Sequence, residues 1–406
     1  MAKNTPNALR LEVLNKVLTS LPVAKENRFL NLFGVDKAES DTVRWMAEYG
    51  AVGMTPFAAP GAPAPVTTDS DWWNEGSARA AYYKEKRYFD EVFLNNLANE
   101  MDIMKRRTSE QVLSKNMMKM NFRIDRRREW MLAQMLFRGG FSYTQEKGLK
   151  FTVDYGIPEN HKIVLSGNDV WGTGSTRNPL EDIYDMKKTL KDDAGVDPEY
   201  IITTSEVVKL LMFDESIREL LKKSTFGDGN LFANPEKVIG ELLGVGTLMT
   251  YDDLYEHRSH LLTNVAIGAN TVVVEDALDF EVGGTARIRD MTKPRAYEDI
   301  KITAIDYASN TLTLETVTAK AYVGGRDVVI CRKRFIDEHS FMMFSTMAEG
   351  QKVAEFIEAP YGLERRWGKY ADTKTEWDPD GIWIRVQDKG LPVLYNPETI
   401  VTMKVK

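Results

Sequence analysis

Few residues of this 406-residue chain stand at spacings that would support catalysis or metal binding. His257 and His260 lie three residues apart, but no third ligand accompanies them, so a zinc site is not indicated. The single cysteine, Cys331, stands in a β-like run, and no histidine and asparagine pattern points to it as a nucleophile. Adjacent acids such as Asp252 and Asp253 carry no specificity among 60 carboxylates. The sequence therefore predicts no catalytic residue, no metal site and no cofactor, and indicates a protein that is not an enzyme.

Motifs that bind nucleotides or activate a serine are also missing from the sequence. Residues 172–174 form a Gly-x-Gly without the third glycine of a dinucleotide site, and no phosphate-binding Gly-x-x-x-x-Gly-Lys loop occurs. No Gly-x-Ser-x-Gly nucleophile elbow is present either.

Aromatic side chains in an irregular segment are a sharper feature. Residues 50–83 are dense in proline and glycine, which argues against helix, yet they hold Phe57, Trp72 and Trp73. Such a segment is typical of a long extended loop whose apolar side chains must pack against another surface. Tryptophan is frequent among interface hot spots, so these aromatic residues are candidates for contacts between subunits. Anchoring of the segment on its own chain remains an equally weighted alternative.

A run of positive charge follows further along the chain. Nine basic and two acidic residues lie between Lys105 and Arg128, including Arg126 and Arg127. This stripe could contact nucleic acid phosphates, or it could be solvated or pair with acidic surfaces of neighbouring subunits. We favour the second interpretation because no aromatic residues that could stack on bases alternate with the arginines. Arg126, Arg127 and Arg128 are therefore candidate subunit-interface residues.

Composition excludes several broad classes of protein. Hydrophobic residues make up 43% of the chain, which is too many for a wholly disordered protein. The formal net charge of −7 argues against a general nucleic-acid coat, and one cysteine cannot form an internal disulfide. No signal peptide and no run of 18 apolar residues is visible, so we expect neither secretion nor a membrane span.

The elements that must position these residues can be read from hydrophobic periodicity. An amphipathic helix is predicted over 8–18, and a helical region over 88–138 with an N-cap near Thr108. An apolar stripe marks that long helix: Leu113, Met117, Met120, Ile124, Met131 and Met135. Residues 180–250 alternate helix and strand, and 261–332 carry five strand signals at short spacing, as a small all-β module would.

This order of parts resembles the Hong Kong 97-like major capsid fold of tailed phages, and its details are most similar to the lambda-type major capsid protein E family. An arm, a long extended loop, a long basic helix, an α/β domain and closing strands follow one another as in that fold. The segments that carry the similarity are residues 28–33, 40–44, 53–57, 126–139, 390–398 and 399–405.

The resemblance implies an α+β fold with an inserted all-β domain and assigns a role to each part. The expected parts are an N-terminal arm (1–49), an E-loop (50–90), a peripheral domain with a spine helix (91–179), an axial domain (180–258), an inserted β domain (259–333), and returns to the axial (334–355) and peripheral (356–406) domains.

The resemblance also implies a function. The chain would be a major capsid protein that assembles into hexamers and pentamers of an icosahedral phage head around double-stranded DNA, in the host cytoplasm. Expected partners are other copies of itself, a separate scaffolding protein, a portal protein and, by nonspecific contact, the packaged DNA, while a decoration protein is left open. No lysine occurs from Ala38 through Tyr83, so an isopeptide lock at the loop tip is not expected, and loop and arm overlap would lock the shell noncovalently. A cellular nanocompartment of the same fold and a polysaccharide-acting enzyme with a β binding module are the alternatives.

Overall fold

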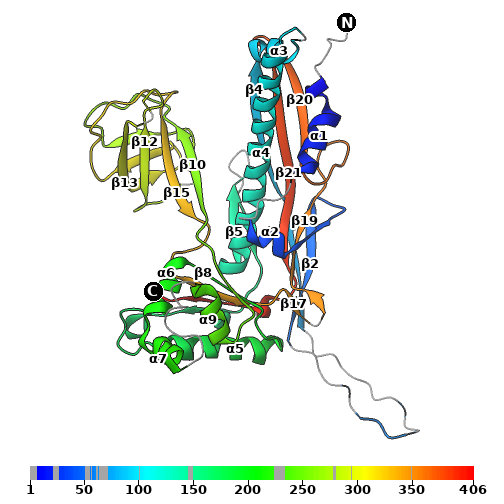
Figure 1. The fold of residues 1–406 in the computed structure, drawn as a ribbon, viewed down its shortest axis with the longest axis vertical. Coiled ribbons are helices and arrows are strands. Elements are labelled where there is room, and N and C mark those ends of the chain that lie inside the picture. Colours follow the sequence, from blue (N-terminus) through cyan, green and yellow to red (C-terminus); the bar gives the residue numbers. More distant parts are fainter. Residues whose placement is uncertain are drawn as a thin grey trace. The chain divides into compact units, whose positions relative to one another are not determined.

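The computed structural model describes residues 7–21, 27–50, 55, 57–60, 63, 72–99, 101–144, 150–223, 234–277, 280–293, 295–348 and 350–406. The chain divides into two compact units, one formed by Met1–Tyr251 with Glu338–Lys406 and the other by Asp252–Asp337 (Figure 1). The second unit is thus an insertion within the first, and its bounds are wider than the range 259–333.

The first unit contains a long sheet in the order β1-β19-β21-β20, with β4 also paired to β21. Strand β21 is 15 residues long, and its first half lies between β20 and β4. The strands are β1 (Gly34–Lys37), β4 (Ala81–Asp90), β19 (Ala354–Glu358), β20 (Tyr370–Trp377) and β21 (Asp380–Leu394).

Helix α4 (Ile103–Arg138) runs along this sheet, as Figure 1 shows. It begins where the Asp102 carboxylate accepts a hydrogen bond from the Lys105 backbone N–H at 3.0 Å, and it ends at Gly139, whose φ of 70° is left-handed. The predicted apolar stripe is confirmed, since all six of its side chains are buried.

The expected helical region over 88–138 is wrong at its start. Residues 81–90 form strand β4, and the short helix α3 (Glu91–Leu97) follows before α4. Alternate side chains of β4 face the core and the solvent, a two-residue period that a helical interpretation overlooked. The N-cap is Asp102, whereas the sequence favoured a position near Thr108. Two further helices, α1 (Leu11–Ser20) and α2 (Arg28–Leu32), pack against α4.

A separate part of the first unit combines a five-stranded sheet, in the order β7-β22-β16-β8-β9, with helices. Its apolar core includes Trp171, Leu190 and Phe341, all of which are fully buried. The elements are β7 (Lys162–Val164), α5 (Pro179–Ala194), β8 (Tyr200–Thr203), α6 (Ser205–Phe213), α7 (Glu215–Lys223), α9 (Pro235–Leu243), β9 (Thr247–Thr250), β16 (Ser340–Phe344) and β22 (Ile400–Lys404). Smaller pairs are β5 (Gly140–Thr144) with β6 (Lys150–Asp154), and β17 (Met347–Ala348) with β18 (Gln351–Lys352).

A two-stranded ribbon pairs β2 (Thr42–Tyr49) with β3 (Trp72–Arg79). The ribbon corrects the expected irregular excursion over 50–83, because its last part forms β3 and the beginning of β4. Trp45 packs inward against Tyr155, with ring centroids 5.6 Å apart, and its indole lies over Gly76 on the partner strand. Any side chain at Gly76 would collide with that ring, so the position requires glycine.

The inserted unit is all β, with strands in the order β10-β15-β12-β13-β14-β11. A bridge between Leu261 and Val274 connects the chain after β10 to the end of β11, which brings the two edges of the sheet together. One apolar core lies inside, with Phe280, Ile288 and Val329 among its members. The strands are β10 (Leu254–His260), β11 (Thr271–Val273), β12 (Thr285–Arg289), β13 (Tyr297–Asp306), β14 (Thr311–Leu314) and β15 (Val328–Arg334). Strand β10 was not predicted, because its polar sequence hides its alternation.

Candidate assembly surfaces

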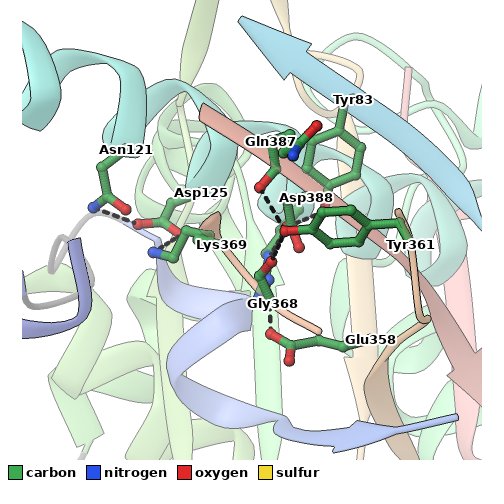
Figure 2. Close-up of polar contacts among 10 residues, drawn as sticks. Tyr83, Asn121, Asp125, Glu358, Tyr361, Gly368, Lys369, Gln387 and Asp388 are labelled. Atoms are coloured by element: carbon green, nitrogen blue, oxygen red, sulfur yellow. Dashed lines mark hydrogen bonds and ion pairs between the residues drawn. The ribbon is translucent and has the colours of Figure 1, made fainter. Parts of the chain in front are cut away.

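Buried charged side chains join the middle of α4 to the long sheet. Arg128 on α4 donates from Nε to Asp388 Oδ2 at 2.7 Å and from Nη2 to Glu358 Oε1 at 2.8 Å. The hydroxyl of Tyr83 donates to the same Asp388 oxygen at 2.6 Å (Figure 2). Because Glu358 and Asp388 belong to β19 and β21, the guanidinium fixes the helix to two strands, and the Tyr83–Asp388 hydrogen bond adds β4 to the network.

Further hydrogen bonds fix the connection between β19 and β20 beside this network (Figure 2). Lys369 donates to Asp125 Oδ1 at 2.8 Å, which ties the end of the connection to α4. The Tyr361 hydroxyl donates to the Gly368 carbonyl at 2.6 Å and lies 3.2 Å from the Gln387 carbonyl. A connection that would otherwise be held only at its ends is thereby fixed at several points.

The electrostatics of the network keep Arg128 charged and Tyr83 protonated. Burial alone would lower the pKa of Arg128, but Asp388, Tyr83 and Glu358 together raise it well above the ordinary value, so the guanidinium stays charged. Burial and the Asp388 carboxylate raise the pKa of Tyr83, so its phenol stays protonated and can donate. The network is therefore a buried ion pair with a neutral donor beside it.

A second buried carboxylate fastens the segment that contains α2. Glu129 is fully buried on α4 and accepts hydrogen bonds from the backbone N–H groups of Phe29 and Leu30 at 3.0 and 2.9 Å. The Tyr251 hydroxyl donates to it at 3.1 Å, and the Phe29 ring packs on the Tyr251 ring with centroids 4.9 Å apart. These first-turn N–H groups have no partner within α2, so the carboxylate satisfies donors that the helix leaves open.

The structure separates the three arginines that the sequence grouped together. Arg128 is only 5% exposed and is paired within the chain, so its charge is not available to a neighbouring subunit. Arg127 is exposed, with its guanidinium 5.2 Å from the centre of the Trp130 ring, and Arg126 is half-buried. Of the three, Arg127 presents the most charge to the surface.

The aromatic candidates lie on or near the ribbon. Phe57 is fully exposed in the connection between β2 and β3, and Trp73 on β3 is 64% exposed opposite Glu48. The Trp72 backbone belongs to β3, but its side chain lies outside the described residues. The structure therefore leaves Phe57 and Trp73 uncovered by the described parts of their own chain.

Sequence reasoning missed other exposed apolar residues of the first unit. Met46 on β2 is 54% exposed and lines a groove of about 320 Å³ with Glu48, Gln351, Lys352, Glu355 and Tyr395. Val92, Met101, Met104 and Trp377 are exposed near the end of the long sheet where β4 leads into α3. Asp102, a favoured N-cap residue directly before Ile103, was the available sign that a helix begins there.

Cys331 and His161 are of residue types that often serve in catalysis or metal binding, but both are enclosed by their own chain. Cys331 is buried in β15, within the core of the inserted unit. His161 is fully buried and its ring nitrogens lie 2.9 Å from Asp193 Oδ2 and 2.8 Å from the Ile400 carbonyl. Within the described ranges, no cluster of three or more His, Cys, Asp or Glu side chains could hold a metal ion, and no helix is long and apolar enough to cross a bilayer.

Comparison with known proteins adds to this geometry. Residues 11–280 match the family model described as phage major capsid protein E. Among solved structures, a protein assigned as the capsid protein of a prophage of E. coli CFT073 has a TM-score of 0.55 and 15% identity, over 98% of this chain and 99% of that one. The capsid protein of cyanophage P-SCSP1u has a TM-score of 0.44 and 10% identity, over 92% and 86% of the two chains. No curated protein matches the sequence.

The match to the family model covers well over half of the sequence, and the first of these structures shares the fold along nearly the full length of both chains. The expected Hong Kong 97-like α+β fold is confirmed. The chain belongs to the phage major capsid protein E family, and it is a bacteriophage capsid protein.

Proposed function

We propose that this protein forms the hexamers and pentamers of an icosahedral phage head that encloses double-stranded DNA. Its membership of the capsid protein E family carries this proposal. A closed shell requires each copy to contact several neighbours through interfaces that repeat by symmetry. The exposed ribbon residues and the exposed apolar residues near α3 are surfaces that neighbouring copies could cover.

In this proposal each part of the chain keeps the role that the family implies. The parts are the N-terminal arm (1–49), the E-loop (50–90), the peripheral domain (91–179 and 356–406) with α4 as its spine, and the axial domain (180–258 and 334–355). The inserted β domain of this proposal, 259–333, lies within the compact unit Asp252–Asp337. The network at Arg128 supports this division, because it joins the base of the E-loop, at Tyr83, to the spine and sheet of the peripheral domain.

We further propose that the shell is locked without covalent bonds. Lysine is absent from Ala38 through Tyr83, so the tip of the loop offers no amine for an isopeptide bond. The ribbon offers apolar area instead, because Trp73 and Met46 project on the same face beside the groove. With about 200 Å² for a tryptophan side chain, covering its exposed 64% at ~25 cal/mol per Å² would stabilise each contact by about 3 kcal/mol. Many such contacts act together in a closed shell.

A separate scaffolding protein and a portal protein are partners in this proposal, and assembly takes place in the host cytoplasm. Packaged DNA would touch the shell nonspecifically, and the net charge of −7 would limit its adhesion. A decoration protein is a further partner that the inserted unit could bind or replace.

Negative-stain microscopy of the expressed protein, alone and with its scaffold, tests the capsid role directly. We expect shells, tubes or capsomer rings. A stable, rigid monomer in every condition would refute the role, and uniform shells that enclose protein cargo would favour the nanocompartment alternative.

The substitution Trp73→Ser separates the lock from the capsid role. We expect shells of this variant to disassemble at a lower urea concentration than those of the wild type. Tyr307→Ser is the matched control, because it removes an aromatic side chain that is 52% exposed on the inserted unit. Equal urea resistance of the wild type and the Trp73→Ser variant would refute the lock and leave the capsid role intact.

A further inference from the structure

The inserted unit carries a charged pocket on the face of its sheet that points away from the core. Four neighbouring strands, β10, β15, β12 and β13, form this face. The pocket has a volume of about 300 Å³, at the lower end of the range for ligand sites. Its lining residues are Glu256, Thr285, Ala286, Arg287, Arg289, Asp299, Ile330 and Arg332.

Pairing between the strands explains why these side chains converge. Arg287 on β12 stands opposite Asp299 on β13 and opposite Ile330 on β15. Glu256 on β10 stands opposite Arg332 on β15. Ile330 is buried although it is on the outward face, so it forms an apolar floor beneath the charged rim.

Two of the three lining arginines are neutralised within the pocket. Arg287 donates from Nε and Nη2 to both oxygens of Asp299, at 2.7 and 3.0 Å, and its guanidinium stacks 3.9 Å from the centre of the Tyr297 ring. Arg332 donates to Glu256 at 3.3 Å, and Arg258, which does not line the pocket, donates to the other oxygen of the same carboxylate at 2.6 Å. These contacts hold the carboxylates and guanidinium groups in place before a ligand arrives.

Arg289 is different. Its Nε atom is buried, and no acceptor among the described residues lies within hydrogen-bond reach of it. Nor does Arg289 form an ion pair within the described ranges, although it lines the pocket beside two neutralised arginines. Among the lining residues, three arginines and two carboxylates leave a net charge of +1, and Arg289 is the lining arginine that no lining carboxylate pairs.

We propose that this pocket binds an acidic saccharide through one carboxylate-bearing sugar ring. Arg289 would pair with the sugar carboxylate, since a guanidinium matches a carboxylate in charge and in planar geometry. Glu256 and Asp299 would accept hydrogen bonds from ring hydroxyls, and Ile330 would contact the apolar face of the ring. The volume suits one ring and its substituents, and the single unbalanced charge suits one carboxylate per ring.

A nucleic acid fits the same pocket less well. Each nucleotide brings a phosphate, and the two carboxylates of the pocket would repel the neighbouring phosphates of the strand. Sugar hydroxyls, in contrast, need acceptors of the kind that these carboxylates provide.

Titration calorimetry of the full chain with tri-galacturonic acid tests the proposal. The matched control ligand is the fully methyl-esterified trisaccharide, which has the same rings without the negative charges. We expect saturable binding of the acid with one site per chain, and at least tenfold weaker binding of the ester. Equal affinity for the two ligands, or absence of binding to the acid, would overturn the proposal.

Variants then locate the site. Arg289→Ala should weaken binding of the acid at least tenfold, and Arg295→Ala should leave it within twofold, because Arg295 is exposed on the connection between β12 and β13 and does not line the pocket. Equal effects of the two substitutions would contradict the assignment.

Two further measurements guard against loss of folding and against a simple polyanion effect. If Arg289→Ala lowers the thermal stability, the variant Thr285→Trp is measured in its place. The exposed Thr285 side chain borders the pocket, so the new indole should block ligand entry. Unchanged binding in that variant would refute the site. A short DNA duplex that competes with the saccharide at lower concentration would replace the saccharide with a polyanion as the ligand. Each outcome is independent of shell assembly.

Discussion

The strongest prediction concerns Arg128, the buried cation between α4 and the long sheet. Replacing it with methionine keeps most of the volume of the side chain but removes the partner of Asp388, which is fully buried, and of Glu358, which is nearly so. Breaking a buried ion pair from one side costs about 3–5 kcal/mol, because a charge is left without compensation in a medium of low polarity. Since a domain is stabilised by about 5–15 kcal/mol in total, Arg128→Met should remove a large share of the free energy of unfolding.

Urea unfolding of the unassembled subunit at neutral pH, followed by tryptophan fluorescence, measures this loss. The matched control is Arg123→Met, on the same helix, because Arg123 pairs with Glu85 at 2.6 Å while its side chain is 61% exposed. Exposed pairs contribute ~0–1 kcal/mol, so the control should change little. The double variant Arg128→Met with Asp388→Asn should regain part of the loss, since it removes the uncompensated charge as well. A cost for Arg128→Met no greater than that of Arg123→Met would refute the reasoning.

Three further predictions follow from contacts in the first unit and from its buried tyrosines. Gly76→Ala should lower the free energy of unfolding by ~1–3 kcal/mol and lower the melting temperature, because the new methyl group would collide with the Trp45 indole; Ser77→Ala is the neighbouring control, and equal melting temperatures would contradict the collision. Glu129→Gln should accelerate amide hydrogen exchange at Phe29 and Leu30, since a neutral amide accepts more weakly than a carboxylate; unchanged exchange there would mean that Glu129 does not hold α2. Alkaline pH should destabilise the fold, because burial raises the pKa of Tyr83, of Tyr361 and, to about 12, of Tyr395. Above pH ~10 the unfolded chain therefore loses protons that the folded chain keeps, and the free energy of unfolding should fall. A free energy of unfolding that stays constant from pH 9 to 11 would contradict this prediction.

Periodicity alone was enough to predict α4 but not the polar contacts that orient it. The apolar stripe continues every three or four residues except for a gap of seven between Ile124 and Met131. Arg128 fills that gap, and its side chain is buried with the stripe. A basic residue at an apolar position is a sign of a buried ion pair, but the sequence does not reveal that its partners are Glu358 and Asp388, more than 200 residues away.

The strands that were missed share a different cause. Strand β4 alternates, but its outward positions carry tyrosine, lysine and aspartate and its half-buried positions carry tyrosine, glutamate and arginine, so the apolar signal is weak. Strand β3 holds Gly76 and Asn74, which are poor strand formers, and its pairing with β2 decides its conformation. Both strands are stabilised by hydrogen bonds to a paired strand more than by their own β propensity. That paired strand cannot be identified from the sequence of the segment alone.

The inserted unit has its first and last strands side by side, with Leu254 of β10 opposite Arg334 of β15. The two ends of the excursion at Tyr251 and Glu338 are therefore brought together by the insertion's own hydrogen bonds, whatever lies between them. A gene could gain or lose these 86 codons in a single event, because for the rest of the protein the insertion closes the chain as a short loop would. The same property would make the position a tolerant place for inserting a foreign peptide.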